Sequence, residues 1–213
     1  MSMTEEKIGA FLEELASSKP VPGGGGASAL AAALGAALSD MVLHLTEGKK
    51  KYAQYQEEIL LLEKELGPLI KTLSEGMDRD AEAFEPLSRA YSLPKETPEE
   101  EEQRQRVMEE ALITASEAPL SLMEDILKAS KITLRVSEIG SSLAISDAGA
   151  AAQLLGAAMK AASLNVFINT GLMKNRDRAG DMDRRAEDLI NENEDLCLKA
   201  YDNVLKRIGK AGR

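Results

Sequence analysis

The chain has 213 residues, of which 44% are hydrophobic, so it is long enough to bury a sizeable core without disulfides. Its net charge is −10 at pH 7, and only 3% of its residues are aromatic. These values exclude nucleic acid as a partner, because phosphate binding needs a basic surface and single-strand binding needs exposed rings. One cysteine and one histidine cannot build a disulfide framework or a structural Cys/His zinc site. With a single histidine in the chain, Ser-His-Asp or Cys-His catalysis is not expected.

The single cysteine and histidine are Cys197 and His44, and both stand beside apolar residues. We expect both side chains to be packed inside the protein, with Cys197 as an inert thiol. The longest apolar run, residues 27–38, is too short to span a bilayer, and the polar start of the chain has no secretion-signal pattern. We therefore expect a cytoplasmic protein with no metal site and no membrane contact.

Hydrophobic periodicity predicts an all-α fold in one domain over residues 1–213. Apolar residues from Ile8 to Leu15 recur at helical spacing and predict a first amphipathic helix. A break rich in proline and glycine follows at 17–26, and an apolar, buried helix is expected at 27–45. The next long helix should cover 52–91, with a kink or break at Gly67-Pro68.

The second half of the chain carries clearer boundary signals. Thr97-Pro98 followed by acidic residues is a strong helix start, and this helix should kink at Pro119 and reach residue 130. A short helix at 131–138 and a loop at 139–145 are expected next. Ser146 should then N-cap an Ala-rich helix that reaches residue 170, and a last amphipathic helix should span 181–208.

A glycine-rich segment, residues 20–26, leads directly into the apolar second helix. Glycines and a helix N-terminus let backbone N–H groups approach an anion or a flat ring closely. The segment lacks the Gly-Lys-Ser/Thr of a nucleotide-binding P-loop, and glycine runs are also common connectors. The pattern therefore leaves two interpretations, a binding loop or a flexible link.

Asp80 shares a helical face with Ala83, Phe84 and Leu87, so its carboxylate stands on an apolar stripe. Burial there would raise its pKa, as in many functional carboxylates, whereas an acid at the edge of the stripe would stay solvated. The pair Ser146-Asp147 offers a second carboxylate beside a loop. This pair could activate water or hold a cation, or it could only cap the helix.

Two further groups of polar residues have a similar double interpretation. The run Lys49, Lys50 and Lys51 could attract a polyanionic ligand, or it could form a solvated turn after a helix C-terminus. Asn165 and Asn169 share a helical face and could hydrogen-bond a heterocycle or each other.

Six segments in this order resemble the cyclodeaminase/cyclohydrolase family of folate enzymes. That family includes the C-terminal domain of formiminotransferase-cyclodeaminase and stand-alone methenyltetrahydrofolate cyclohydrolases. The chain departs from it at Gly140-Ser141-Ser142-Leu143, where family members often carry Gly-Asn and a second Asn, so an amide contact from this loop is not expected. The matching segments are PVPGGGGASA (20–29), MVLHLTEGKKKY (41–52), MDRDAEAF (77–84), YSLPK (91–95), SDAGAAA (146–152) and NVFIN (165–169).

The resemblance implies a single-domain helical bundle with long kinked helices, a homodimer, and no cofactor beyond a tetrahydrofolate substrate. Hydrolysis of 5,10-methenyltetrahydrofolate to 10-formyltetrahydrofolate is the favoured activity, because no formiminotransferase segment accompanies these residues. A formimidoyltetrahydrofolate cyclodeaminase that releases ammonia is the alternative. A third possibility is a non-catalytic helical dimer that binds an anionic ligand.

The resemblance also distributes roles among the residues singled out above. Asp147 would transfer the proton, and Asp80 would hold the cation or the pterin. The three lysines would meet the glutamate tail. The remaining substrate-binding residues would be Pro22, Gly23, Gly24, Gly25, Gly26, Ser146, Asn165 and Asn169.

Overall fold

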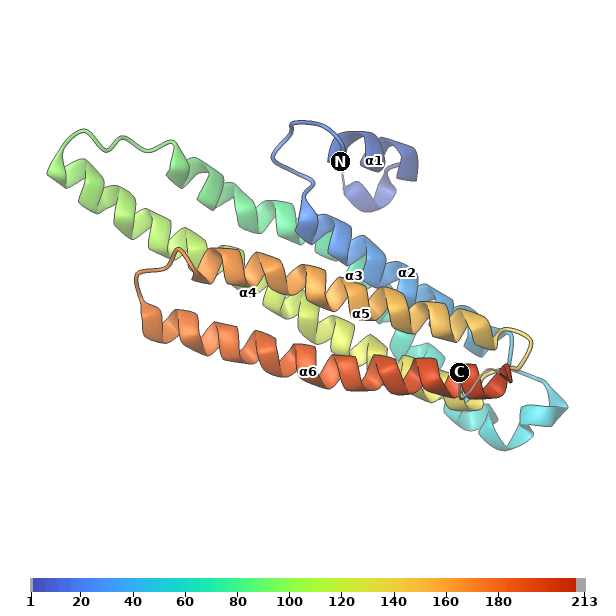
Figure 1. The fold of residues 1–213 in the computed structure, drawn as a ribbon. Helices are drawn as coiled ribbons and strands as arrows, with labels where there is room; N and C mark the ends of the chain where they lie inside the picture. The colour runs from blue at the N-terminus through green and yellow to red at the C-terminus, as the bar shows by residue number, and fades with distance from the viewer. Residues whose placement is uncertain (1, 210–213) are drawn as a thin grey trace.

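Five long helices run side by side and form an elongated bundle in the computed structural model, which describes residues 2–209 (Figure 1). Every regular element of this range is helical, which confirms the predicted all-α class. The long helices are α2 (Gly24–His44), α3 (Gln56–Tyr91), α4 (Pro98–Ile139), α5 (Ile145–Thr170) and α6 (Arg176–Arg207). The short ones are η1 (Met3–Glu5), α1 (Ile8–Leu15) and η2 (Lys50–Tyr55).

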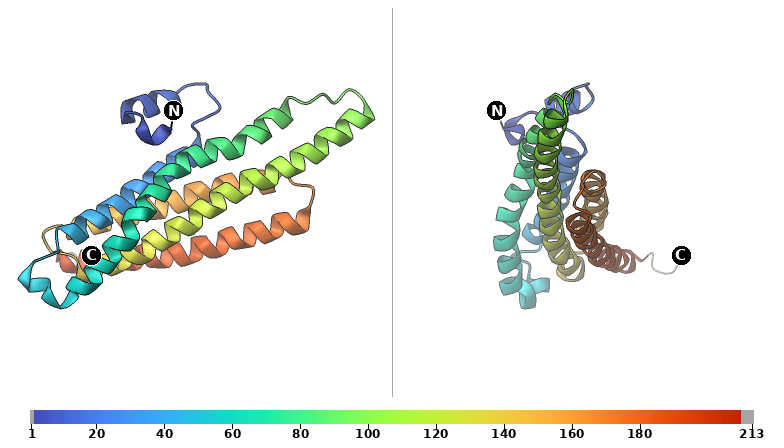
Figure 2. Two further views of the ribbon diagram at one scale, coloured as in Figure 1. Left: turned by 180° about the vertical axis from the view of Figure 1, so that it is seen from behind. Right: turned by 90° about the vertical axis from the view of Figure 1, so that its left-hand side faces the viewer.

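Helices α4 and α5 lie at the centre of the bundle and pack against each other. Helix α2 packs on α5 and α3, α3 also packs on α4, and α6 packs on α4 and α5 (Figure 2). The predicted helix α1 forms over Ile8–Leu15, yet it buries only Phe11 and lies beside the bundle (Figure 1).

Small side chains bring α2 and α5 close together. The face of α2 that meets α5 includes Gly35, where an added Cβ would lie 2.9 Å from Cγ of Leu155 and 3.1 Å from the carbonyl oxygen of Ala151. Alanines are buried along both helices, at 29, 32, 33 and 36 of α2 and at 148, 151, 152, 158 and 162 of α5. The small side chains therefore allow close helix packing within the chain.

The boundary signals of α4 are confirmed, but its length is not. The Thr97 hydroxyl accepts a hydrogen bond from the backbone N–H of Glu100, and the Glu100 carboxylate accepts one from the backbone N–H of Thr97. These two bonds make a complete capping box, with Pro98 at the first helical position. The helix then runs unbroken to Ile139 instead of ending at residue 130. The predicted separate helix at 131–138 is its last part, since no breaker stands between them.

Four helix starts differ from the sequence-based boundaries. Helix α3 begins at Gln56 rather than residue 52, because the short helix η2 occupies residues 50–55. Helix α2 begins at Gly24 rather than residue 27, so three of the four glycines are helical. Helix α6 begins at Arg176, where the side chain of Asn175 caps it by accepting a hydrogen bond from Arg178. The expectation that Ser146 caps α5 is wrong, because Ala144 occupies the N-cap position and Ser146 lies inside the first turn.

The outward faces of α2 and α5 are apolar. By length and composition alone, each of these two helices could cross a membrane, and 56% and 44% of their most apolar stretches are buried within the bundle. Large apolar side chains are well exposed on both helices, namely Leu34 on α2 and Leu164 and Ile168 on α5. The chain therefore presents an apolar surface as well as an apolar core.

The two single residues have different environments. Cys197 is buried, and burial raises the pKa of its thiol, as expected for an inert core cysteine. The expected packing of His44 is wrong, because its side chain is 59% exposed in the last turn of α2. Its imidazole lies near Asp40 and Glu63 instead.

Candidate active site

A pocket of about 300 Å³ opens where the glycine segment meets α3 and α5. Backbone from the glycine segment forms one wall, and apolar and aromatic side chains form much of the rest. The polar side chains that reach it belong to residues singled out from the sequence, Asp80, Asn165 and Asn169. The other lining residues are Pro20, Val21, Gly23, Gly24, Gly25, Phe84, Leu87, Tyr91, Ala115, Ile168 and Leu172.

Asp80 is joined to the first turn of α2. The backbone N–H of Gly26 donates a 3.1 Å hydrogen bond to Oδ2 of Asp80. Burial raises the pKa of the Asp80 carboxyl, and the Gly26 bond offsets part of that rise. The carboxylate thus combines a polar anchor with an environment that favours proton uptake.

Gly25 is required for this arrangement. A Cβ on Gly25 would lie 1.9 Å from Oδ1 of Asp80, far inside any van der Waals contact. A Cβ on Gly26 would lie 3.5 Å from Cβ of Pro22, which is an ordinary contact. At Gly25 the glycine segment therefore packs directly against Asp80 and forms part of the pocket wall. This close contact does not support the interpretation of the segment as a simple flexible link.

The two asparagines do not bond to each other. Nδ2 of Asn169 donates to the carbonyl oxygen of Ala115 at 2.9 Å, and Nδ2 of Asn165 donates to that of Ala161 at 3.2 Å. An asparagine side chain has two N–H bonds and a carbonyl oxygen, so each keeps capacity for a polar ligand in the pocket. Pro22, in contrast, is buried behind the glycines and does not line the pocket.

A second polar cluster occupies the opposite end of α2 and α5. Nζ of Lys49 donates a 3.0 Å hydrogen bond to Oγ of Ser141, and the backbone N–H of Ser142 donates to the hydroxyl of Tyr52 at 2.9 Å. Lys51 lies over the ring of Tyr52, 5.5 Å from its centroid. The loop that lacks the family's asparagines therefore makes hydroxyl and backbone contacts.

Tyr52 is the perturbed group of this cluster. Its hydrogen bond with the side chain of Ser142 lowers its pKa to about 8, against the opposing effect of burial. The backbone bond from Ser142 and the charge of Lys51 act in the same direction as the Ser142 side chain. The sequence analysis did not select Tyr52 as a site residue, because a tyrosine after a lysine run carries no signal of its partners.

The first turn of α5 lies at this second end. Ser146 is exposed and Asp147 is half-buried. Asp147 and Asn165 are 18 positions apart on α5, which at 1.5 Å per residue separates them by roughly 27 Å. Within one chain, Asp80 and Asp147 therefore do not share a pocket, contrary to the expectation that they act on one substrate side by side.

Comparison with known proteins gives this arrangement a context. Residues 7–188 match the family model described as formiminotransferase-cyclodeaminase. The chain belongs to this family. The pocket beside Asp80 and the polar cluster around Tyr52 both lie within the matched range. The match confirms the family resemblance that six short sequence segments indicated.

Relatives in this family carry two different activities in their names. The chain is 39% identical to a methenyltetrahydrofolate cyclohydrolase of Methylorubrum extorquens over 204 residues, covering 95% of this chain and 98% of that one. It is 32% identical to the formimidoyltransferase-cyclodeaminase of Rattus norvegicus over 168 residues, covering 79% of this chain and 31% of that one.

A solved structure supports the fold. The crystal structure of a formiminotetrahydrofolate cyclodeaminase from Thermotoga maritima superposes with a TM-score of 0.79, covers 96% of each chain and is 24% identical. At that identity the likeness establishes the helical architecture only.

Proposed function

We propose that the chain is a methenyltetrahydrofolate cyclohydrolase, which converts 5,10-methenyltetrahydrofolate and water to 10-formyltetrahydrofolate and a proton. The observation that carries the proposal is the 39% identity to a cyclohydrolase over nearly the full length of both chains. The pocket beside Asp80 supports it, because it offers a carboxylate, two amides and aromatic surface to a flat cationic substrate.

The reaction needs a proton acceptor and a negative environment. Water adds to the methenyl carbon between N5 and N10 and loses one proton, which leaves a neutral hydroxylated carbon. The bond from that carbon to N5 then breaks while the hydroxyl proton passes to N5, and the formyl group stays on N10. Asp80 suits the cation, since its carboxylate faces the pocket while Gly26 holds it in place. We propose no metal or redox cofactor for these steps.

The second polar cluster is proposed to act across a homodimer. Lys49 and Asp147 stand at the far end of α2 and α5 from the pocket, so one chain cannot bring them to a substrate held beside Asp80. Two copies could pair antiparallel about a two-fold axis through the apolar outer faces of α2 and α5. The end that carries Lys49 and Asp147 in each copy would then lie against the pocket of the other copy. The exposed Leu34, Leu164 and Ile168 would be covered in the same contact.

In this arrangement Asp147 of one copy assists proton transfer near the pocket of the other. The lysine run of that same copy would receive the glutamate tail of the folate, since a carboxylate-rich tail is attracted to clustered positive charge. Ser146, Asn165 and Asn169 would complete the polar contacts to the substrate.

Cyclodeamination is the second candidate. It passes through a similar tetrahedral carbon, except that N10 attacks a formimino carbon on N5 and ammonia leaves. The 32% identity to the rat formimidoyltransferase-cyclodeaminase favours it, although this chain spans 31% of that protein's length.

The two activities are separated by one pair of assays with the purified chain. Loss of methenyltetrahydrofolate ultraviolet absorbance should be faster with enzyme than without, in a buffer that does not itself catalyse hydrolysis. Ammonia release from 5-formiminotetrahydrofolate should be slow or absent. No acceleration of the first reaction would remove the cyclohydrolase proposal, and rapid ammonia release would replace it with the cyclodeaminase.

A further inference from the structure

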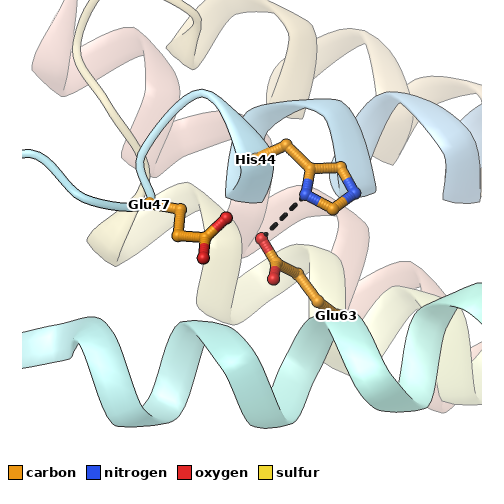
Figure 3. A group of neighbouring side chains, drawn as sticks. All are labelled: His44, Glu47 and Glu63. Carbon is orange, nitrogen blue, oxygen red and sulfur yellow. Dashed lines mark ion pairs between the residues drawn. The ribbon is translucent and has the colours of Figure 1, made fainter.

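A histidine and three carboxylates meet where the end of α2 passes α3, outside the pocket described above. Asp40 and His44 belong to the last turns of α2, Glu47 to the turn that follows, and Glu63 to α3. Figure 3 shows His44, Glu47 and Glu63 pointing toward one another from these elements. One possible ligand atom from each of the three lies within 4.8 Å of the other two.

The two nitrogens of His44 face different carboxylates. Nε2 lies 3.5 Å from Oδ2 of Asp40, and Nδ1 lies 3.1 Å from Oε1 of Glu63. A hydrogen on Nε2, directed at Asp40, would leave a lone pair on Nδ1 that faces the Glu63 oxygen. A carboxylate behind a histidine is the usual partner of a metal-bound imidazole, because it fixes the tautomer and the ring orientation.

In that tautomer, the lone pairs of His44 Nδ1 and Glu63 Oε1 would repel each other unless a positive charge lay between them. The separation of 3.1 Å is close to the roughly 3.4 Å between ligand atoms of a tetrahedral zinc ion with bonds of about 2.0–2.1 Å. A neutral imidazole with its proton on Nδ1 would donate to Glu63, but it would then turn the lone pair of Nε2 toward Asp40. An imidazolium would donate to both, but it carries one charge and the cluster contains three carboxylates.

Two of the carboxylate oxygens are buried without any hydrogen bond. They are Oε1 of Glu63 and Oδ1 of Asp40. The Glu63 side chain is only 11% exposed. Buried carboxylate oxygens without donors are characteristic of groups that are held by a cation.

We propose that Nδ1 of His44 and the carboxylates of Glu47 and Glu63 bind one divalent transition-metal ion of the Zn²⁺ type, with Asp40 orienting the imidazole. One histidine with two carboxylates and an open position for water is a donor set that Zn²⁺ accepts. The ion would join the end of α2 and the turn that leads to Lys49 to the N-terminal part of α3. Its role is structural, and it does not depend on the proposed reaction.

The test is direct binding to the full chain, prepared without a histidine tag and stripped with a chelator. Titration calorimetry with ZnCl₂ should show one site per chain with micromolar or tighter affinity. CoCl₂ should give the visible absorption of a tetrahedral Co²⁺ ion. The Tm should rise when Zn²⁺ is present.

Single substitutions locate the site. His44→Gln and Glu63→Gln should each weaken Zn²⁺ binding by roughly a hundredfold, and Asp40→Asn by roughly tenfold, as for other partners of metal-bound histidines. Glu65→Gln is the matched control, because it removes the same charge from an exposed position two residues away on α3. It should leave the affinity unchanged.

Several outcomes would overturn the proposal. Absence of a one-to-one Zn²⁺ complex would show that His44 only makes polar contacts with its carboxylate neighbours. Equal affinity in the wild type and His44→Gln would place any bound metal elsewhere on the acidic surface. Circular dichroism of each variant, with Asp40→Asn as the mildest change, separates lost binding from lost folding.

Discussion

The two ends of the α2–α5 pair are built on different physical principles. At the glycine end, backbone and side chains enclose a pocket, and a carboxylate is held against the first turn of a helix. At the lysine end, the perturbed groups belong to a turn and a loop, and cationic side chains surround a buried tyrosine. The glycine end depends on close fit, so a change of one atom there matters greatly. The lysine end depends on charge, which acts over longer distances and is weakened by salt.

The largest effect is expected from Gly25→Ala. The new Cβ would lie 1.9 Å from Oδ1 of Asp80, so the carboxylate must move, and displacement of a reacting group by about an ångström can reduce catalysis roughly a hundredfold. Cyclohydrolase kcat/KM should fall by about that factor. Gly26→Ala, with its ordinary 3.5 Å contact, should keep most of the activity. Equal activity of both variants would show that the fit at position 25 is not needed.

Asp80→Asn should reduce turnover by roughly a hundredfold, in the range for a lost acid–base or charge-stabilising group. In contrast to its turnover, the stability of the Asp80→Asn variant should increase relative to the wild type once the wild-type carboxyl ionises. Because the folded-state pKa of Asp80 is raised above its ordinary 3.8, ionisation disfavours the folded protein, and stability is lost as the pH rises through the interval between the two values.

Asn cannot ionise, so the difference in Tm between Asp80→Asn and the wild type should shift in favour of the variant as the pH rises from about 4 to 7. Thermal melts followed by circular dichroism at several pH values measure this difference. A difference in Tm that does not change with pH would mean that Asp80 has an ordinary pKa.

Asp147→Asn tests whether the two ends work together across copies. Asp147 lies inside the first turn of α5, so Asn should cost only the helix-dipole contribution of about 0.3–1 kcal/mol. The fold should therefore persist while turnover falls by roughly a hundredfold. Mixing this variant with Asp80→Asn should restore activity to about a quarter of the wild type, since half of randomly paired dimers carry one intact site out of two. No recovery on mixing would exclude a site shared between copies.

Tyr52→Phe should have a moderate effect. It removes the hydroxyl that accepts the Ser142 N–H and should cost on the order of 1 kcal/mol of stability. Because the pKa of Tyr52 is lowered to about 8, the wild type should gain stability as the pH rises from about 8 to 10. Ultraviolet titration of the wild type should show one tyrosine ionising near 8, absent from the variant. An unchanged titration curve in Tyr52→Phe would refute the assignment.

The smallest effect is expected from replacing Lys49, Lys50 and Lys51 with Ala together. Exposed charge pairs contribute about a kcal/mol or less each, so the KM for polyglutamylated substrate should rise severalfold and kcat should change little. The KM for the monoglutamate should change less, and added salt should reduce the difference. A large loss of kcat instead would assign these lysines to the chemical step.

Local sequence determined most of the helical framework. The capping box at Thr97 and Glu100, the periodic apolar residues of α1 and the small residues of α2 and α5 act through contacts within a few positions or along one helical face, so their pattern can be read directly. The glycine segment and the carboxylate on an apolar stripe could each be recognised as a candidate from the sequence, since each carries its own local signal.

Tertiary structure alone decided which of these residues come into contact. Asp80 and Gly26 are 54 positions apart and Lys49 and Ser141 are 92 apart, and no periodicity encodes such pairs. The same is true of the distance between Asp80 and Asp147, which follows from the direction in which α5 runs past α2 rather than from either motif. His44 shows the reverse case, since its apolar neighbours predicted burial, whereas the rotation of the last turn of α2 directs it to Glu63 on another helix. Helix formation is a local property of the chain, but the position of one helical face against another depends on the packing of the whole bundle.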